Sequence, residues 1–577
     1  MGWRPRLCEL MQQIEILLQK GRALQDEGRY EGAITAFEDI LRQYPSHAEA
    51  NFLVGLVADQ MGNSEVALRF LLRATTEAPD LPSPLNALAE TYLKLRHYAE
   101  AERCYADIAH RLLPDNVEIH RSLGQMRRIL LRVDDSIAAY EKAIELDPKS
   151  ATSWLELAAT LSVSYTRFDE RDKVLRRASE LGWDDFDVVC GVGRRHLLEG
   201  QYEEAERHFR RAGALVEGKS VSPIFHYERA IALQALGRGA DADAELEVAL
   251  EIGMGVFRTG KTLVELCELA GILVFELAAF CVPVLLALGR RDEAIQTAQR
   301  IARQGPPSTF SFSESIYLTN PLKRIERFES VVAGRDVAIL LQGPSIRQLE
   351  ERIGELAGED ICYASLNQFP QIDERVLSKI GERLDVVMVG NPLSFVKHEE
   401  QVYEFLARDE NNMLAGTDFM TTTVDVNKFG GKTFRERFDS KLIYFDCQHY
   451  YPPTLIRPLH FSSGNTLSVL IPFLLLAKPR RIFIFGSDGG GDPTSNDGAY
   501  FFSKSPGDKT ERNRVAETYR RLRLDARHCD QNVEASMIMI SVLYSVPIPE
   551  IYNVCLDSAN RAFPRISYDD AFEMLKA

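Results

Sequence analysis

The chain has 577 residues, more than one hydrophobic core usually organises, so its length predicts at least two domains. Hydrophobic residues make up 45% and charged residues 26% of the sequence, a balance typical of folded, soluble proteins. The net charge of −16 excludes a general nucleic-acid binder and a polybasic membrane anchor, because both need a dense basic surface.

The nine cysteines are scattered singly along the chain, without a CxxC pair. This pattern favours reduced thiols over disulfides or zinc ligands and therefore predicts a cytoplasmic protein. Residues 1–20 mix charged and apolar residues in a helical pattern and contain no uninterrupted apolar stretch, so we expect no secretory signal there.

A period of about 34 residues runs through the first part of the chain. Four prolines recur at nearly constant spacing, and a small residue lies about three helical turns before each of them. The small residue lets two helices approach closely, and the proline ends the second helix. The prolines are Pro45, Pro79, Pro114 and Pro148, and the small residues are Ala33, Ala67, Ala101 and Ser136.

This pattern resembles the tetratricopeptide (TPR) repeat, a helical hairpin of the same period, and residues 140–148 match its consensus closely. Less regular copies continue after about residue 150, so we assign residues 1–305 to an all-α array. One hairpin cannot bury its apolar face alone, and the hairpins should therefore stack into a superhelix. Its concave face would bind a protein partner or an acceptor; a spacer or an oligomerisation arm is the alternative.

Two segments of the array resemble sequence motifs of other functions, a phosphate loop and a membrane span. Residues 255–262 match the phosphate-loop pattern G-x-x-x-x-G-K-[ST], but a predicted helix precedes them instead of the buried strand that the motif requires. Residues 271–289 are apolar enough to imitate a membrane span, but Glu276 and Pro283 interrupt them. We therefore expect no nucleotide site and no transmembrane span here, and a buried helix pair at 271–289.

Residues 306–335 begin as a connection rich in Pro, Ser and Thr, and the periodicity changes after them. From residue 336 to 577 short apolar runs alternate with amphipathic segments, which predicts a Rossmann-like α/β domain with a doubly wound parallel sheet. Ligands of such sheets bind at the carboxyl ends of the strands. The predicted strands are Val337–Leu341, Ile361–Ser365, Val386–Val389, Lys441–Phe445, Arg481–Phe485 and Glu550–Val554.

Small and polar residues follow the first three of these strands. The first strand runs into Gly343-Pro344-Ser345, where glycine permits close backbone approach and Ser345 can cap a helix whose free N–H groups face an anion. Asn367 and Asn391 follow the next two strands. A carboxamide can donate to and accept from a base or a sugar, although an Asn that merely forms a turn is the alternative.

A second group of candidates lies nearer the C-terminus. Ser462-Ser463-Gly464 precede an apolar helix, and Asp488 follows a strand, where it could order a loop, bind a hydroxyl or hold a metal. Tyr500 lies beyond a glycine run, and His528 follows an arginine-rich helix. A histidine can remove a proton from an attacking hydroxyl. The competing histidines are His398, His449 and His460.

In their order and spacing these segments resemble the bacterial sialyltransferases of glycosyltransferase family 42 and the related domains of flagellin-glycosylation proteins and 6-hydroxymethylpterin diphosphokinases. The resemblance covers about residues 336–577, and its most specific part is Asn367-Gln368-Phe369 followed by a strand and Asn391-Pro392. The remaining segments that carry it are 343–345, 462–464, 486–488 and Tyr552-Asn553-Val554-Cys555-Leu556-Asp557-Ser558.

The resemblance implies transfer of sialic acid, with inversion, from a CMP-activated donor without an essential metal. It also implies that His528 is the general base and that Tyr500 contacts the departing phosphate. The residues that would hold the donor are Gly343, Pro344, Ser345, Asn367, Asn391, Ser462, Ser463, Gly464 and Asp488.

The sequence thus predicts a cytoplasmic glycosyltransferase whose repeats bind a partner or position a glycan or protein acceptor. One alternative is a magnesium-dependent, diphosphokinase-like enzyme that uses ATP, with Asp488 and Asp492 holding the metal. Another is a non-catalytic repeat scaffold that carries a degenerate sugar-nucleotide fold. A chelator should leave the sialyltransferase active and silence the diphosphokinase.

Overall fold

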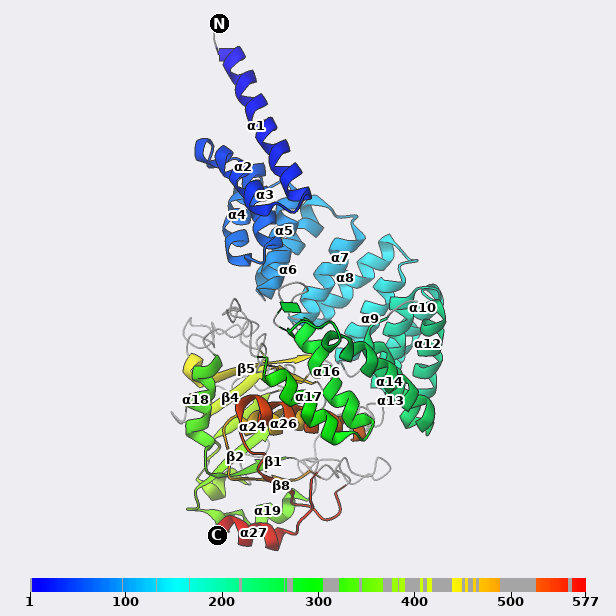
Figure 1. The fold of residues 1–577 in the computed structure, drawn as a ribbon, viewed down its shortest axis with the longest axis vertical. Helices are drawn as coiled ribbons and strands as arrows, with labels where there is room; N and C mark the ends of the chain where they lie inside the picture. Colours follow the sequence, from blue (N-terminus) through cyan, green and yellow to red (C-terminus); the bar gives the residue numbers. More distant parts are fainter. Residues whose placement is uncertain are drawn as a thin grey trace. The chain divides into compact units, whose positions relative to one another are not determined.

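The structure, a computed structural model, forms two compact units, Met1–Arg177 and Ala178–Ala577. The first unit is helical, and the second contains further helical hairpins and a parallel sheet (Figure 1). This confirms the predicted fold class; the predicted boundaries at residues 305 and 335 stay predictions. The structure describes residues 3–577 except 96, 131, 165–166, 217–220, 264, 267–272, 305–320, 342–344, 367–375, 382, 390–404, 408–411, 418–437, 449–451, 455–459, 463–465, 488–525 and 559–562.

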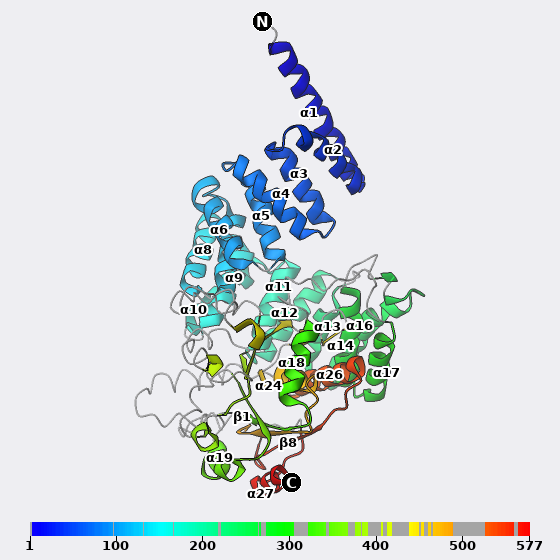
Figure 2. The ribbon, with the colours of Figure 1, turned by 90° about the vertical axis from the view of Figure 1, so that its left-hand side faces the viewer.

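The first unit consists of helical hairpins, in which each helix from α1 to α9 packs on its neighbour along the chain (Figure 2). The four small residues of the repeat are fully buried, as predicted. Ser136 also donates a hydrogen bond from Oγ to the carbonyl of Gly124 at 2.7 Å, which ties the two helices of its hairpin together. The helices are α1 (Trp3–Asp26), α2 (Tyr30–Gln43), α3 (Ala48–Gln60), α4 (Ser64–Glu77), α5 (Pro82–Lys94), α6 (Tyr98–Asp107), α7 (Val117–Ile129), α8 (Val133–Leu146), α9 (Ala151–Ser164) and α10 (Phe168–Leu181).

The third hairpin contains a π-helical turn. Its second helix begins as α6 and continues as η1 (Ile108–Leu112), where the N–H of Leu113 donates to the carbonyl of Ile108 at 2.8 Å. The interval from the small residue to the proline, Ala101 to Pro114, is one position longer here than in the other three hairpins. A π-turn accommodates one extra residue within a helix, and it therefore accounts for the irregular interval.

The second unit opens with further hairpins: α11 (Phe186–Leu198), α12 (Tyr202–Leu215), α13 (Pro223–Ala235) and α14 (Gly239–Met254). Helix α14 leads directly into the short 3₁₀ helix η2 (Gly255–Phe257). The phosphate-loop-like segment therefore follows a helix and not a strand, as predicted, and it lacks the setting in which that motif binds phosphate.

The apolar segment at 271–289 contributes helix α16 (Leu273–Ala287), and α17 (Arg291–Ala302) is its hairpin partner. Phe280, Val282 and Val284 of α16 are fully buried, so the expected buried setting is confirmed. The described part of the segment is nevertheless one helix that continues through Pro283, not the expected pair. Among the helices that the structure describes, none is long and apolar enough to cross a membrane.

Within the described residues, the sheet of the second unit has eight parallel strands in the order β6-β5-β4-β3-β2-β1-β7-β8. All six predicted strands are present and begin and end close to their predicted bounds, whereas β4 and β6 were not predicted. The strands are β1 (Asp336–Leu340), β2 (Ile361–Leu366), β3 (Val386–Val389), β4 (Met413–Thr417), β5 (Leu442–Gln448), β6 (His460–Ser462), β7 (Arg481–Phe485) and β8 (Glu550–Asn553).

Helices pack on both faces of this sheet, as expected of a doubly wound fold. One face packs on α19 (Ile346–Arg352) and α27 (Tyr568–Lys576). The other packs on α18 (Pro321–Val332), α24 (Thr466–Leu475) and α26 (Ala526–Tyr544).

Helix α26 also packs on α16 and α17, the last hairpin of the helical part. Its residues Ile538 and Met539 are buried in the core that the hairpins form, whereas Met537 and Ile540 are buried in the core of the sheet. At the margin of this contact, Arg291 of α17 forms an ion pair with Glu534 at 2.7 Å. Helix α26 therefore belongs to both cores.

Candidate functional site

The chain reverses its direction of travel through the sheet between β1 and β7. From β1 it moves outward through β2 to β6, and it then returns to the other side of β1 to form β7 and β8. Leu340 pairs with Phe485 at the carboxyl ends of these two strands, and the N–H of Leu341 donates to the carbonyl of Phe485 at 2.9 Å. In open parallel sheets, such a reversal creates the crevice in which ligands bind.

Three of the predicted site residues lie at least partly within the described chain. Ser345 immediately precedes α19, Ser462 is the last residue of β6, and the backbone of His528 lies in the first turn of α26. The other predicted residues lie outside the described residues, and their convergence on one site stays a prediction. They are Gly343, Pro344, Asn367, Asn391, Ser463, Gly464, Asp488 and Tyr500.

The described strands nevertheless fix where the chain enters each of these segments. The segments with Gly343, Asn367, Asn391 and Asp488 follow β1, β2, β3 and β7, which are parallel neighbours and end at the same edge of the sheet. Helix α26 ends shortly before the first residue of β8, so it runs back along the sheet against the strand direction. The backbone of His528 is at the opposite end of this helix.

The expected capping role of Ser345 is wrong. Its side chain makes no capping hydrogen bond, because its backbone is helical (φ −62°, ψ −20°) rather than extended. Its carbonyl instead accepts a hydrogen bond from the hydroxyl of Tyr568 at 2.9 Å. Helix α27 thereby holds the start of α19, a long-range contact that no local sequence pattern indicates.

A buried polar cluster joins the ends of β7 and β8. The side-chain amide of Asn553 donates to Ser558 Oγ at 2.9 Å, and Ser558 Oγ donates to the carbonyl of Ser487. The backbone of Asn553 is held as well, since its N–H donates to the carbonyl of Pro564 at 2.8 Å. These contacts fix the turn that precedes Asp488.

Gly486 makes this turn possible. Its φ of 75° lies in the left-handed region, which a residue with a side chain enters only at a cost. The glycine directly after β7 is therefore favoured by the backbone geometry, independently of any ligand. The sequence shows Gly486-Ser487-Asp488 and the segment 552–558 as separate motifs, and nothing in it indicates that they are in contact.

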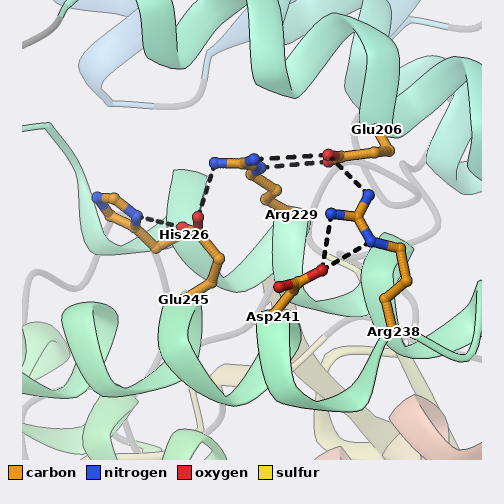
Figure 3. Close-up of polar contacts among 6 residues, drawn as sticks. All are labelled: Glu206, His226, Arg229, Arg238, Asp241 and Glu245. Carbon is orange, nitrogen blue, oxygen red and sulfur yellow. Dashed lines mark hydrogen bonds and ion pairs between the residues drawn. The ribbon is translucent and has the colours of Figure 1, made fainter.

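A second polar cluster, the α12–α14 cluster, lies within the helical part of the second unit (Figure 3). Arg229 bridges two carboxylates, donating to Glu245 at 2.7 Å and to Glu206 at 3.2 Å. His226 Nδ1 is 2.7 Å from Glu245, and Arg238 contacts both Glu206 and Asp241. Because each member is paired with an oppositely charged or hydrogen-bonding neighbour, this cluster joins three helices and is not a candidate site.

The metal required by the diphosphokinase alternative receives no support from the described residues. They contain no group of three His, Cys, Asp or Glu side chains that could hold a metal ion. Asp488 and Asp492, the ligands named for that alternative, lie outside the described residues. Independence from metal thus stays a prediction.

Two family models, both described as tetratricopeptide repeat, match the helical region. One matches residues 18–82 and 86–158, and the other matches residues 139–207. Residues 18–207 are tetratricopeptide repeats. Such arrays typically bind protein segments, which favours a protein partner for the TPR array.

Two curated relatives match parts of the chain. The auxiliary subunit of the N-terminal acetyltransferase A complex from Arabidopsis thaliana is 25% identical over 134 residues, 23% of this chain and 15% of that protein. A protein O-mannosyl-transferase from Homo sapiens is 23% identical over 159 residues, 27% of this chain and 18% of that protein. The chain thus spans less than a fifth of the length of either relative.

Solved structures are also similar to parts of this chain. A TPR protein from Parabacteroides merdae is 17% identical, covers 52% of this chain and 95% of its own, and has a TM-score of 0.32. The MamA protein is 19% identical, covers 30% of this chain and 92% of its own, and has a TM-score of 0.28. The family matches end at residue 207, and any function of the α/β domain must be argued from its own geometry.

Proposed function

We propose that residues 336–577 form a glycosyltransferase of the sialyltransferase type that uses a CMP-linked sugar donor. The observation that carries this proposal is the reversal of strand order between β1 and β7. Because of this reversal, β1 and β7 are neighbours. The first precedes Gly343-Pro344-Ser345 and the second precedes Gly486-Ser487-Asp488, and both segments belong to the family resemblance. A crevice at such a reversal is where a nucleotide binds in this class of sheet.

The proposed reaction requires two contributions from the protein: stabilisation of the charge on the leaving phosphate and removal of a proton from the acceptor hydroxyl. The acceptor hydroxyl attacks the anomeric carbon, the bond from that carbon to the phosphate oxygen breaks, and CMP leaves with the electron pair. In this scheme His528 takes the hydroxyl proton, and Tyr500 donates a hydrogen bond to the leaving phosphate. Asn367 and Asn391 bind the donor through their carboxamides.

The TPR array would then recruit the acceptor, either a protein or a glycan carried by a protein. One curated relative is itself named a mannosyl-transferase, but the match spans 18% of it, so the proposal rests on the sheet and not on that name. The cytoplasmic location is proposed from the single, scattered cysteines of the sequence, and the five cysteines whose side chains the structure describes are free thiols. They are Cys104, Cys190, Cys281, Cys362 and Cys555.

The test is donor turnover by the full chain. Purified protein is incubated with CMP-sialic acid and EDTA, and release of CMP is measured for the wild type and for His528→Ala. His398→Ala and His449→Ala serve as matched controls, since both remove a competing histidine from the same domain. Release that persists in EDTA and is lost only in His528→Ala supports the proposal.

The same assay separates the alternatives. Turnover of ATP that requires magnesium would indicate the diphosphokinase-like enzyme. Absence of turnover with either substrate, in a protein that remains folded, would contradict an enzymatic role and leave the repeat scaffold.

A further inference from the structure

The π-turn of the third hairpin adjoins a pocket that neither the family matches nor the proposed function explains. The extra residue of this hairpin lies between Ala101 and Pro114, and the structure shows η1 in that interval. The pocket has a volume of about 430 Å³, within the range of binding sites for small ligands and side chains. Single π-turns often occur at functional sites, so the irregular repeat spacing and the pocket are two independent signals at one place.

Three elements form the walls of this pocket, which we name the η1 pocket. Two of them, η1 and α8, belong to the second helices of consecutive hairpins, and α7 comes between them in the chain. The lining residues are Ala109, His110, Pro114, His120, Leu123, Arg127, Ala138, Ala139 and Lys142.

The lining combines basic and apolar side chains and includes no acidic one. Arg127 donates from Nε to Glu102 at 3.1 Å and from Nη1 to the carbonyl of Asp135 at 3.3 Å, which holds its guanidinium in place at the wall of the pocket. Lys142 is 40% exposed and pairs with Glu145, an exposed neighbour on the same helix, at 3.0 Å. Such an exposed pair contributes little and can exchange for another carboxylate.

The two histidines differ in their setting. His120 is buried, and its Nε2 lies 2.8 Å from the carbonyl of Pro114, so it fixes the end of the π-turn. His110 is exposed at the mouth of the pocket, on the π-turn itself. Leu123, Ala138 and Ala139 provide the apolar part of the lining.

We infer that the η1 pocket binds a segment of a partner protein that carries a carboxylate beside an aliphatic side chain. The carboxylate is recognised by Arg127 and Lys142, and the aliphatic group contacts Leu123 and the two alanines. The local basic lining is complementary to an acidic ligand although the whole chain has a net charge of −16. This inference concerns the first unit and does not depend on the proposed enzymatic activity.

The inference is tested with the full chain and two labelled hexapeptides, one of alternating Glu and Leu and one of alternating Lys and Leu. Fluorescence anisotropy at low salt should show at least tenfold tighter binding of the glutamate peptide. Lys142→Glu should weaken that binding at least tenfold, whereas Lys149→Glu, an exposed lysine outside the pocket, should change it less than twofold.

A deletion of His110 provides a second variant. It restores the shorter interval of the other hairpins, should convert η1 to a regular α-helix, and should abolish binding while circular dichroism retains the helix content. The inference is overturned if the wild type binds the lysine peptide as tightly as the glutamate peptide or binds neither. It is also overturned if Lys142→Glu binds the glutamate peptide as tightly as the wild type does. If the deletion variant does not fold, the Lys142→Glu variant still tests the inference.

Discussion

The side-chain amide of Asn553 donates a hydrogen bond to Ser558 Oγ at 2.9 Å, and this pair anchors the turn after β7 through the carbonyl of Ser487. Asn553 is fully buried and Ser558 nearly so. Water therefore cannot replace either partner at little cost. This contact makes the end of β8 a support for the carboxyl edge at which we place the donor.

Replacing Asn553 by Leu should lower the free energy of unfolding by about 1–3 kcal/mol, because Ser558 and Ser487 lose a buried partner. The urea midpoint of the full chain, followed by circular dichroism, measures the change. Asp557→Ala is the matched control, since Asp557 is the exposed neighbour of Ser558 after β8 and should alter the midpoint little. An equal effect of the two substitutions would contradict the support role of Asn553.

Gly124 of α7 should not tolerate even a methyl group. A Cβ at this position would lie 2.8–3.0 Å from the ring of Tyr140, which is itself 1% exposed. Gly124→Ala should therefore destabilise the first unit by about 1–3 kcal/mol, although alanine is the better helix former. Thermal unfolding followed by circular dichroism gives the direction of the change.

Gly213→Ala is the control for this substitution. Gly213 also lies inside a helix, but a Cβ there would meet Phe225 at an ordinary 3.7 Å. It should stabilise the protein by up to about 1 kcal/mol. If both substitutions stabilise the chain, close helix packing does not explain why position 124 is a glycine.

The repeats were predictable because their signal is periodic and local. The small residues and the prolines recur once per hairpin, and the structure confirms the buried packing of the small residues. The sequence also shows the longer interval, Ala101 to Pro114, that contains the π-turn. Whether an extra residue enters a helix or a loop depends on packing against α7 and α8, which an interval alone does not reveal.

Strand prediction failed where the apolar signal is short. Strand β6 spans only His460–Ser462, fewer residues than an alternating or continuous apolar pattern needs. Strand β4 contains a buried run, Met413 to Ala415, but Gly416 and Thr417 follow it and resemble a turn. Contacts such as Asn553 to Ser487 join residues far apart in the chain, and no periodicity encodes them.

The pH dependence of stability should reveal the ion pairs at the amino end of the sheet. Asp336 is 1% exposed, and its two carboxylate oxygens accept hydrogen bonds of 2.6–3.0 Å from Arg480 and Arg481. Burial raises the pKa of Asp336, but the two guanidinium groups outweigh burial and hold the pKa below its ordinary value.

Because the folded pKa is lower than the unfolded one, Asp336 stabilises the fold fully above about pH 4, and the contribution is lost as the pH falls through the folded pKa. Asp336→Asn should cost about 3 kcal/mol or more at pH 7. The difference between wild type and variant should shrink as the pH falls below about 4, as measured by urea midpoints. A difference that stays constant over this range would contradict the role of the carboxylate charge.

The α/β domain should not be separable from the last TPR-like hairpin without loss of solubility. A fragment of residues 306–577 lacks α16 and α17 and would expose Ala535, Ile538 and Met539 of α26, which are buried in the full chain. Such a fragment should bind a hydrophobic dye and aggregate at concentrations at which the full chain does not. A monomeric fragment that unfolds at the temperature of the full chain would show that the hairpin is dispensable.

The most direct test of the account is calorimetric titration of CMP into the full chain and its variants. We expect CMP to bind, and Asn367→Ala and Asn391→Ala to weaken it at least tenfold, which corresponds to about 1.4 kcal/mol for a lost donor contact. Asp360→Ala, just before the amino end of β2, should leave the affinity unchanged, since it removes only the ion pairs of an exposed carboxylate with Arg335 and Arg383 at the opposite edge of the sheet. Undetectable CMP binding would contradict a donor site at the carboxyl edge. An equal loss of CMP affinity in Asp360→Ala and in the two asparagine variants would contradict it as well.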